Sequence, residues 1–338
     1  MLNSVIVAAS GCTIKAADGR VYLDMTSGTA VPGVGHSRPE VISAVHQQIR
    51  RYAHVDGYDR FVAPVQVEFA ERLTRVAGAR LTKACLTSGG AEAIDYALEL
   101  ARAHTGRLKV MACREEEFVP FDDLDAAAAA VDEHTAAVIV EPIQGRVPAD
   151  AFLPGLRELC TSRGALLICD ENRGGMGVTG TWFSHQLWGV DPDIVTCAIG
   201  GGFPLGAVLA RPEVFASLGT TMSGSPVACV AGIAAFDLIE KEGLVAKAAE
   251  TGAYLRERLE SVRGQFPDLL VDVRGRGLWW AFDLSVPAQP VVEAIRERGV
   301  LVGSVRQAVV LAPPLVITPA EIDVFIGVLR VVLRRVST

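Results

Sequence analysis

Four continuous apolar segments alternate with helical patterns in the first half of the chain. The predicted strands are residues 83–88, 107–113, 136–142 and 165–171. The predicted helices between them are residues 91–105, 124–132 and 152–164. A strand without polar alternation is buried on both faces, which is typical of a parallel sheet covered by helices on each side. The sequence therefore predicts a large α/β domain.

A different pattern follows from about residue 235. Residues 269–284 alternate like an antiparallel strand pair, with a short strand at 308–312. Helices are predicted at residues 244–263, 289–299 and 319–335. These elements predict a small C-terminal α+β domain.

The N-terminal region begins with a predicted hairpin. Residues 11–25 alternate around an Asp18-Gly19 turn. Helices are predicted at residues 38–53 and 65–77. We expect three parts: residues 1–40 packing with the small domain, residues 41–235 forming the large α/β domain, and residues 236–338 forming the small α+β domain.

Charge and residue spacing exclude several classes of partner. The formal net charge is -7 and no basic tract is interleaved with aromatic residues, so nucleic acid is not expected. No His/Cys/Asp cluster has the spacing of metal ligands, so no metal is expected. Neither a signal peptide nor a membrane-spanning run is found, and the seven cysteines form no CxxC pair. A cytoplasmic protein with reduced thiols is the expectation.

Half of the residues are hydrophobic, which is high for a soluble protein. Two interpretations remain open. The composition fits a large buried subunit interface, and it equally fits an Ala/Val/Leu-rich core.

Polar residues and glycines gather where predicted strands end. Ser88-Gly89-Gly90-Ala91 joins a strand to a helix, which is the geometry of an anion site at a helix N-terminus. An ordinary strand-to-helix turn, with Glu92 contributing to the helix start, is the alternative. Asp170, at the end of a predicted strand, lies where α/β enzymes place chemistry, although a lone aspartate there is more often a cap.

Several runs resemble the class III aminotransferases, in the same order over nearly the whole chain. They include "DGRVYLDMTSGTAVPGVGHSRPEV" (18–41), "TSGGAEAIDYALELARAHTGR" (87–107), "AAVIVEPIQG" (136–145), "LRELCTSRGALLICDE" (156–171) and "DIVTCAIGGGFPLGA" (193–207). The pattern is most similar to acetylornithine and ornithine aminotransferases. The resemblance implies a pyridoxal phosphate (PLP)-dependent fold of type I, with a large parallel-sheet domain, a small domain and a homodimer.

The resemblance also implies roles for individual residues. Ser88, Gly89, Gly90 and Ala91 match the turn that holds the cofactor phosphate. Asp170 matches the aspartate that pairs with the pyridinium nitrogen, and Gln144 and Glu141 match residues near the ring. Thr221 matches a threonine that reaches the phosphate from the other subunit.

The chain departs from the family where the chemistry is expected. The family's "DIVTLAKGLGGGFPLGA" carries the lysine that forms the Schiff base, whereas here Ile199 stands at that position in a segment shorter by two residues. An isoleucine has no nitrogen with which to form an imine. Val310 stands where the family has its carboxylate-binding arginine. The family's aromatic-His-Gly segment, which stacks on the cofactor ring, is missing after Cys113.

None of the chain's lysines is a convincing substitute for the missing one. They are Lys15, Lys83, Lys109, Lys241 and Lys247. These departures predict a degenerate member of the family that has lost transamination.

Three functions remain open. In the first, the old pocket works as a biosynthetic enzyme without PLP on an amino-acid-like small molecule, and no cofactor is expected. Its candidate catalytic groups are Asp170, Glu171, Arg173, Glu141 and His36, although His36 fits a structural loop histidine as well. In the second, the chain is a non-catalytic subunit paired with an active aminotransferase. In the third, it binds PLP or pyridoxamine phosphate (PMP) non-covalently through Gly90, Ala91, Asp170 and Thr221.

Overall fold

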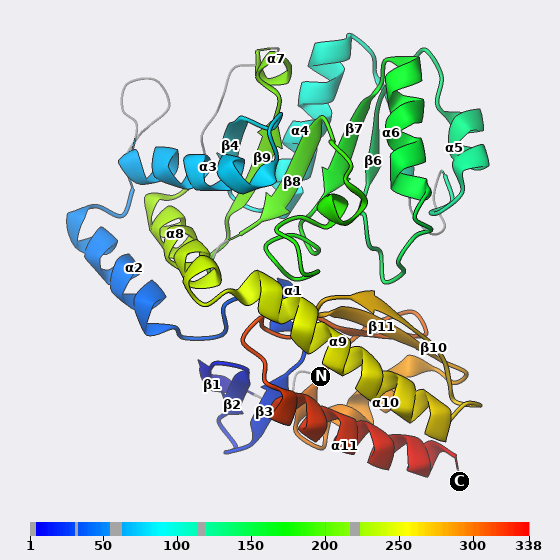
Figure 1. The fold of residues 1–338 in the computed structure, drawn as a ribbon. Coiled ribbons are helices and arrows are strands. Elements are labelled where there is room, and N and C mark those ends of the chain that lie inside the picture. Colours follow the sequence, from blue (N-terminus) through cyan, green and yellow to red (C-terminus); the bar gives the residue numbers. More distant parts are fainter. Residues whose placement is uncertain are drawn as a thin grey trace. The chain divides into compact units, whose positions relative to one another are not determined.

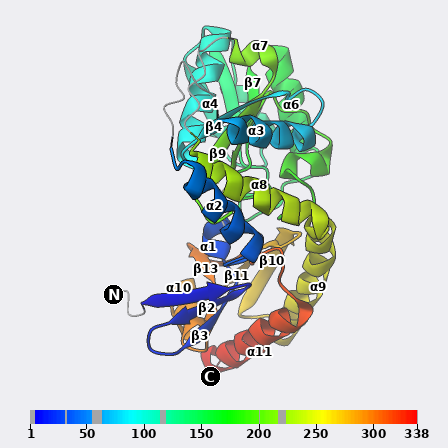
Figure 2. The same ribbon diagram turned by 90° about the vertical axis from the view of Figure 1, so that its left-hand side faces the viewer.

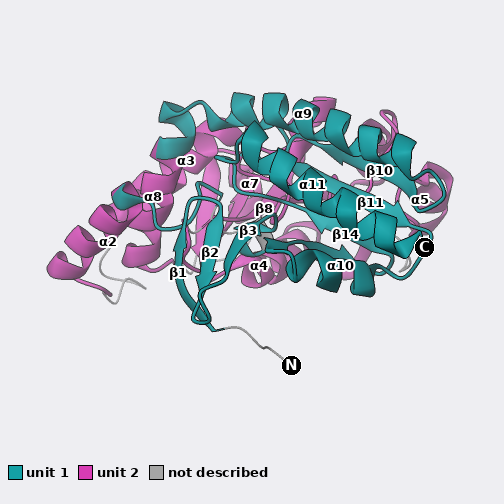
Figure 3. Ribbon diagram, turned by 90° about the horizontal axis from the view of Figure 1, so that it is seen from below, with its two compact units in different colours: residues 1–39, 177–180, 238–338 teal, residues 40–176, 181–237 magenta. Residues whose placement is uncertain are grey.

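The computed structural model describes residues 5–30, 33–54, 63–113, 119–199, 201–216 and 224–337. The chain forms two compact units (Figure 3). The smaller unit consists of residues 1–39, 177–180 and 238–338, and the larger unit consists of residues 40–176 and 181–237. Each unit therefore combines segments that are distant in the sequence. None of the helices in the described ranges is long and apolar enough to cross a membrane.

The larger unit is built on a six-stranded sheet with the order β4-β9-β8-β7-β6-β5 (Figure 1). Its strands are β4 (Lys83–Thr87), β5 (Lys109–Cys113), β6 (Thr135–Val140), β7 (Leu166–Asp170), β8 (Ile194–Ala198) and β9 (Gly206–Ala210). The neighbours from β5 to β8 are parallel, as the apolar segments predict. The predicted parallel sheet is nevertheless mixed, because β9 runs antiparallel to β4 and β8. Residues 199–205 are too few for the crossover that a parallel neighbour needs.

Helices cover both faces of this sheet. Helix α4 (Gly90–Thr105) lies on one face and α6 (Phe152–Arg163) on the other (Figure 2). Alternate strand residues such as Ala137 and Ile168 join one buried cluster with Ala97 of α4. The remaining helical elements here are α2 (Pro39–Arg51), α3 (Pro64–Ala77), α5 (Leu124–Ala130), the 3₁₀ helix η1 (Ser184–Trp188), α7 (Pro212–Phe215) and α8 (Pro226–Lys241). Pro39 and residues 238–241, at the ends of α2 and α8, belong to the smaller unit.

The smaller unit contains two four-stranded sheets, with the orders β1-β2-β3-β12 and β10-β11-β14-β13. The strands are β1 (Ile6–Ser10), β2 (Thr13–Ala16), β3 (Val21–Asp24), β10 (Leu270–Arg276), β11 (Trp279–Leu284), β12 (Val300–Leu301), β13 (Gly303–Val305) and β14 (Ala308–Leu311). The helices are α1 (Ser27–Ala30), α9 (Leu244–Gln265), α10 (Ala288–Arg296) and α11 (Pro319–Val336). The predicted N-terminal hairpin and the antiparallel pair β10–β11 are confirmed.

Some elements of the structure were not assigned by the sequence analysis, and for several of them the hydrophobic periodicity is too weak to indicate a helix or a strand. The unassigned elements are β1, β8, β9, β12, β13, α1, α7, α8 and η1. Helix α8 has apolar residues at most of its positions, so no polar face marks its period. Strands β12 and β13 are only two and three residues long, which is too short for a period of two to stand out.

Candidate functional site

The carboxyl ends of β4, β6, β7 and β8 lie at one edge of the six-stranded sheet. Strands β6, β7 and β8 are parallel, and β4 shares their direction because β9 is antiparallel to both of its neighbours. Ser88, Glu141, Asp170 and Ile199 lie at or just beyond these four strand ends. We call this edge, which carries the carboxyl ends of the parallel strands, the carboxyl edge. Open α/β sheets bind their ligands at this edge.

Asp170 is the last residue of β7, where the β7–β8 pairing sets it opposite Thr196. Its Oδ1 accepts hydrogen bonds from the Asn172 backbone N–H and from the Thr196 hydroxyl, each at 3.1 Å. Burial raises the pKa of Asp170 although these hydrogen bonds oppose the shift. A cationic N–H brought close to this carboxyl group would favour its ionised form.

Glu141 follows β6 and forms an ion pair with Arg173, which follows β7. The Glu141 side chain is 12% exposed, whereas that of Arg173 is 42% exposed. The second carboxyl oxygen of Glu141, Oε1, is buried and has no hydrogen-bond partner among the described residues. Burial raises the pKa of Glu141 to about 7, against the opposing charge of Arg173. Glu141 is therefore the candidate acid or base of this edge.

The raised pKa of Glu141 predicts a pH dependence of stability. Between its usual pKa of 4.5 and about 7, the folded protein keeps a proton that the unfolded chain has released. Because the folded state binds more protons in this window, its stability falls as the pH rises, by at most about 3 kcal/mol. We expect Glu141→Gln to flatten this fall in cofactor-free protein, measured by urea titrations at a series of pH values. An unchanged slope in the variant would contradict this assignment.

The turn before α4 is shaped by close backbone contacts. A Cβ added to Gly206, the first residue of β9, would lie 2.4 Å from the carbonyl oxygen of Gly89. A Cβ added to Gly90 would lie 2.6 Å from Asn172 Oδ1. That amide also donates from Nδ2 to the Gly90 carbonyl oxygen at 3.2 Å, while its Oδ1 is buried without a partner in the described ranges. The first N–H groups of α4 have no partners within the helix.

Ser88 and Glu92 close the start of α4. The backbone N–H and the hydroxyl of Ser88 both donate to Glu92 Oε2 at 2.6 Å. Glu92 therefore contributes to the helix start, as the alternative interpretation expects, and it occupies both of the Ser88 donors that the predicted phosphate contact would use. Ala91 lies in the first turn, so the predicted Ser88-Gly89-Gly90-Ala91 turn lies at the same edge as Asp170.

Glu171 is engaged inside the protein. Its side chain has no exposed surface and accepts from the backbone N–H groups of Ser184 and His185, both at 2.8 Å. The His185 ring nitrogen Nδ1 lies 3.0 Å from Glu171 Oε1. These contacts hold the chain after Asp170 against η1, and they give Glu171 a structural role in place of the predicted catalytic one.

The other predicted site residues lie in different places. Gln144 donates from Nε2 to the Cys113 carbonyl oxygen, which joins the ends of β5 and β6. His36 belongs to the smaller unit, where its Nε2 lies 2.8 Å from Asp24 Oδ2. Although burial opposes the shift, hydrogen bonds from His36 and Thr26 lower the pKa of Asp24. Thr221 lies outside the described residues.

Ile199 is buried at the end of β8, with its N–H bonded to the Leu205 carbonyl oxygen at 2.8 Å. The two lysines of the larger unit, Lys83 and Lys109, each begin a strand. They therefore lie at the opposite edge of the sheet from Asp170. Lys109 bonds there to Asp132 Oδ2 at 2.6 Å. Across the described ranges, no group of three His, Cys, Asp or Glu residues could hold a metal ion.

The comparisons with known proteins agree with this geometry. The family model described as aminotransferase class-III matches residues 1–118 and 115–333 of the chain. The chain belongs to the class III aminotransferase family. It is 36% identical over 365 residues to an acetylornithine aminotransferase of Methanosarcina mazei, covering 96% of this chain and 91% of the relative. It is also 36% identical over 372 residues to an acetylornithine aminotransferase of Mycobacterium tuberculosis, covering 98% and 92%.

Solved structures of other proteins share the fold. The acetylornithine aminotransferase of Elizabethkingia anophelis matches with a TM-score of 0.90 at 26% identity, covering 99% of this chain and 95% of that one. A phospholyase from Arthrobacter in complex with phosphoethanolamine matches with a TM-score of 0.88 at 29% identity, covering 98% and 94%. This class III chain therefore has the type I α/β fold of PLP-dependent transferases, as predicted.

The expectation that the protein works without a cofactor is wrong. Acetylornithine and ornithine aminotransferases are PLP-dependent, and a cofactor is therefore expected for this class III chain. The residues at the carboxyl edge fit such a group. The glycine turn before α4 suits a phosphate, and Asp170 with the unpartnered Asn172 Oδ1 suits a group that carries hydrogen-bond donors.

Sequence reasoning missed two residues that shape this edge. Thr196 holds Asp170 by a hydrogen bond, and Asn172 packs against the turn before α4. The pairing of β7 with β8 could have indicated Thr196, had β8 been assigned as a strand. No sequence signal indicates the contact between Asn172 and Gly90, because it depends on how β7 and α4 are placed.

Proposed function

We propose that this class III protein binds PLP or PMP at the carboxyl edge without a covalent bond to lysine. The observation that carries the proposal is the combination of Asp170, at the end of β7, with Ile199, at the end of β8. The edge retains acceptors for the cofactor, but the neighbouring strand end offers no amine. The bound cofactor would supply a ring that accepts electrons from an amino compound.

The chain's own residues would divide the work at this edge. The turn at Gly89, Gly90 and the start of α4 would hold the phosphate through backbone N–H groups. Asp170 would hold a proton at the ring nitrogen, because an ionised carboxylate favours the protonated base. Glu141, with its pKa raised to about 7, would move protons close to neutral pH.

The names of the relatives favour conventional transamination, but the positions of the lysines in this chain do not. A lysine that bonds to the cofactor must reach it, and Lys83 and Lys109 begin their strands at the opposite edge of the same sheet. Lys15 in β2, Lys241 at the end of α8 and Lys247 in α9 belong to the smaller unit. The phospholyase relative indicates that this fold is not tied to one reaction.

The substrate that we propose is an amino-acid-like small molecule, in line with the acetylornithine aminotransferases that the chain resembles. We also propose a homodimer, since class III aminotransferases commonly form one. No observation favours pairing with a separate active aminotransferase.

Reduction with borohydride followed by mass spectrometry tests the proposal. The protein is saturated with PLP, treated with borohydride, digested, and searched for lysine peptides that carry the cofactor mass. We expect equilibrium dialysis to show saturable PLP binding and no modified lysine. A stoichiometrically modified lysine peptide would restore conventional transamination as the function, and the absence of saturable binding would reject the cofactor site.

Asp170→Asn provides a variant for the same dialysis experiment. An asparagine keeps the shape of Asp170 but lacks the charge that would hold a proton at the ring nitrogen. We expect PLP affinity to fall by about 10- to 100-fold, the range of a charge-assisted hydrogen bond. Thr196→Val, which removes only one hydrogen bond to Asp170, is expected to have a smaller effect. Equal affinities for all three proteins would contradict the role of Asp170.

A further inference from the structure

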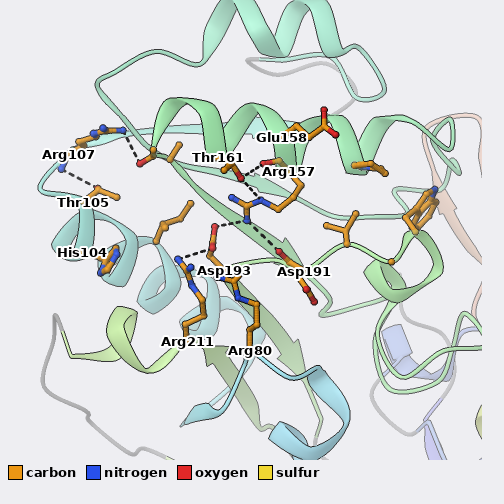
Figure 4. A pocket seen from close by; sticks show the side chains of 17 residues that line it. Arg80, His104, Thr105, Arg107, Arg157, Glu158, Thr161, Asp191, Asp193 and Arg211 are labelled. Carbon is orange, nitrogen blue, oxygen red and sulfur yellow. Dashed lines mark hydrogen bonds and ion pairs between the residues drawn. The ribbon is translucent and has the colours of Figure 1, made fainter.

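A cavity lies in the larger unit at the edge of the sheet opposite to Asp170. Its volume is about 760 Å³, within the range of small-molecule sites. Arg80 precedes β4, Arg107 precedes β5, and Arg211 follows the antiparallel β9, so all three lie at the amino ends of the parallel strands. Arg157 reaches the cavity from α6 (Figure 4).

Asp193 fixes two of these arginines. Its side chain is 6% exposed, and its Oδ2 accepts from the Leu167 backbone N–H and from Arg157 Nη1, both at 2.7 Å. Its Oδ1 lies 2.9 Å from Arg211 Nη2. One buried carboxylate thus orients two guanidinium groups in the lining of the cavity, and Arg211 also has Glu213 at 3.4 Å.

The other two arginines have no carboxylate partner in the described ranges. Arg107 Nη1 donates only to the carbonyl oxygens of Thr135, Arg163 and Gly164, at 3.0 to 3.1 Å. Arg80 is exposed and forms no hydrogen bond or ion pair with any described residue. Both guanidinium groups therefore retain donors that can bind an anion.

The two remaining acidic residues of the lining oppose the binding of an anion only weakly. Asp191 and Glu158 also line the cavity, and both are exposed to water. Figure 4 shows the Glu158 carboxylate pointing away from Arg157, Arg211 and Arg80. Exposed carboxylates are screened by solvent and by salt, so they oppose anion binding only weakly.

The lining of the cavity also includes apolar side chains. Trp188 of η1, Pro154 of α6 and Val190 contribute to the lining. An organic group could pack there while an attached anion meets the guanidinium groups. Planar guanidinium groups match the oxygen geometry of phosphates and carboxylates.

We propose that this cavity is a binding site for an organic oxyanion, a phosphate ester or a carboxylate. The anionic group meets Arg80 and the Nη1 group of Arg211, which the contacts of Arg211 with Asp193 and Glu213 leave without a partner among the described residues. The organic part packs against Trp188. The site belongs to the larger unit alone and is separate from the edge that carries Asp170.

Isothermal titration calorimetry with phenyl phosphate, benzoate and inorganic phosphate tests this site at constant low ionic strength. We expect saturable binding below about 10 mM, tighter for the aromatic ligands than for inorganic phosphate. The phenyl phosphate and benzoate titrations identify which oxyanion is preferred. Arg80→Gln is expected to weaken binding by about tenfold. Arg51→Gln, which removes an exposed arginine at the end of α2, should change it less than about twofold.

Hydrogen exchange of the wild-type protein with the tighter ligand locates the binding. We expect protection in peptides that cover residues 78–82 and 188–193. Arg80 is exposed, so Arg80→Gln should keep the melting temperature of the wild type. Absence of saturable binding, or equal affinity in Arg80→Gln and the wild type, would overturn the proposal. Protection confined to peptides around Ser88 and Asp170 would also overturn it.

Discussion

Replacing Glu171 with alanine is expected to lower the free energy of unfolding by about 3–5 kcal/mol, because it breaks a wholly buried polar cluster. The Glu171 and His185 side chains are 0% and 2% exposed. The carboxylate accepts hydrogen bonds from two backbone N–H groups of η1 and lies within hydrogen-bond distance of the His185 ring. Removing it leaves these groups buried without water, and each unmade hydrogen bond costs about 1–3 kcal/mol.

Urea titration at a fixed protein concentration measures this loss. Glu158→Ala is the matched control, since Glu158 is an exposed glutamate in α6 of the same unit, and its effect should stay within about 0.5 kcal/mol. Glu171→Gln keeps one acceptor oxygen but turns an amide toward N–H donors, so an intermediate loss is expected. A Glu171→Ala variant as stable as Glu158→Ala would show that this cluster does not hold the loop after Asp170.

The second large effect is expected from Gly252→Ala in α9. A Cβ at this position would lie 1.8 Å from the Gly277 carbonyl oxygen, closer than any real contact. The obstacle is backbone, which cannot rotate away as a side chain can. Both residues belong to the smaller unit, so separating α9 from the β10–β11 turn disturbs its packing. We expect a loss of about 3 kcal/mol or more in the free energy of unfolding.

The same helix provides the control. Gly264 also lies in α9, but a Cβ there would meet nothing within 4 Å. Gly264→Ala should therefore stabilise the protein by about 0.5 kcal/mol, because alanine loses less backbone entropy on folding than glycine. If both substitutions changed the urea midpoint in the same direction and by the same amount, close packing at Gly252 would be refuted.

The candidate site shows where reasoning from the sequence ended. The end of an apolar strand indicated Asp170, because parallel strands bring their carboxyl ends to one edge. Glu141 was indicated only by the family resemblance. The sequence analysis placed Asp170 and Glu171 together among the candidate catalytic groups, although only Asp170 was also assigned to the cofactor. In the structure, the Asp170 carboxyl group lies at the carboxyl edge, whereas the Glu171 carboxyl group is hydrogen-bonded to η1. Successive side chains leave a strand in opposite directions, and only the packed neighbours decide what each one meets.

Periodicity and motif order by themselves determined the family, the alternation of strands and helices, and most element bounds. These features are local, since apolar spacing and turn residues act within a few positions of the chain. Tertiary structure alone decided the pairing of β9 with β4, the ion pair of Glu141 with Arg173, and the convergence of arginines around Asp193. Each joins segments far apart in the sequence, and their energies depend on burial and distance, which exist only once the chain has folded.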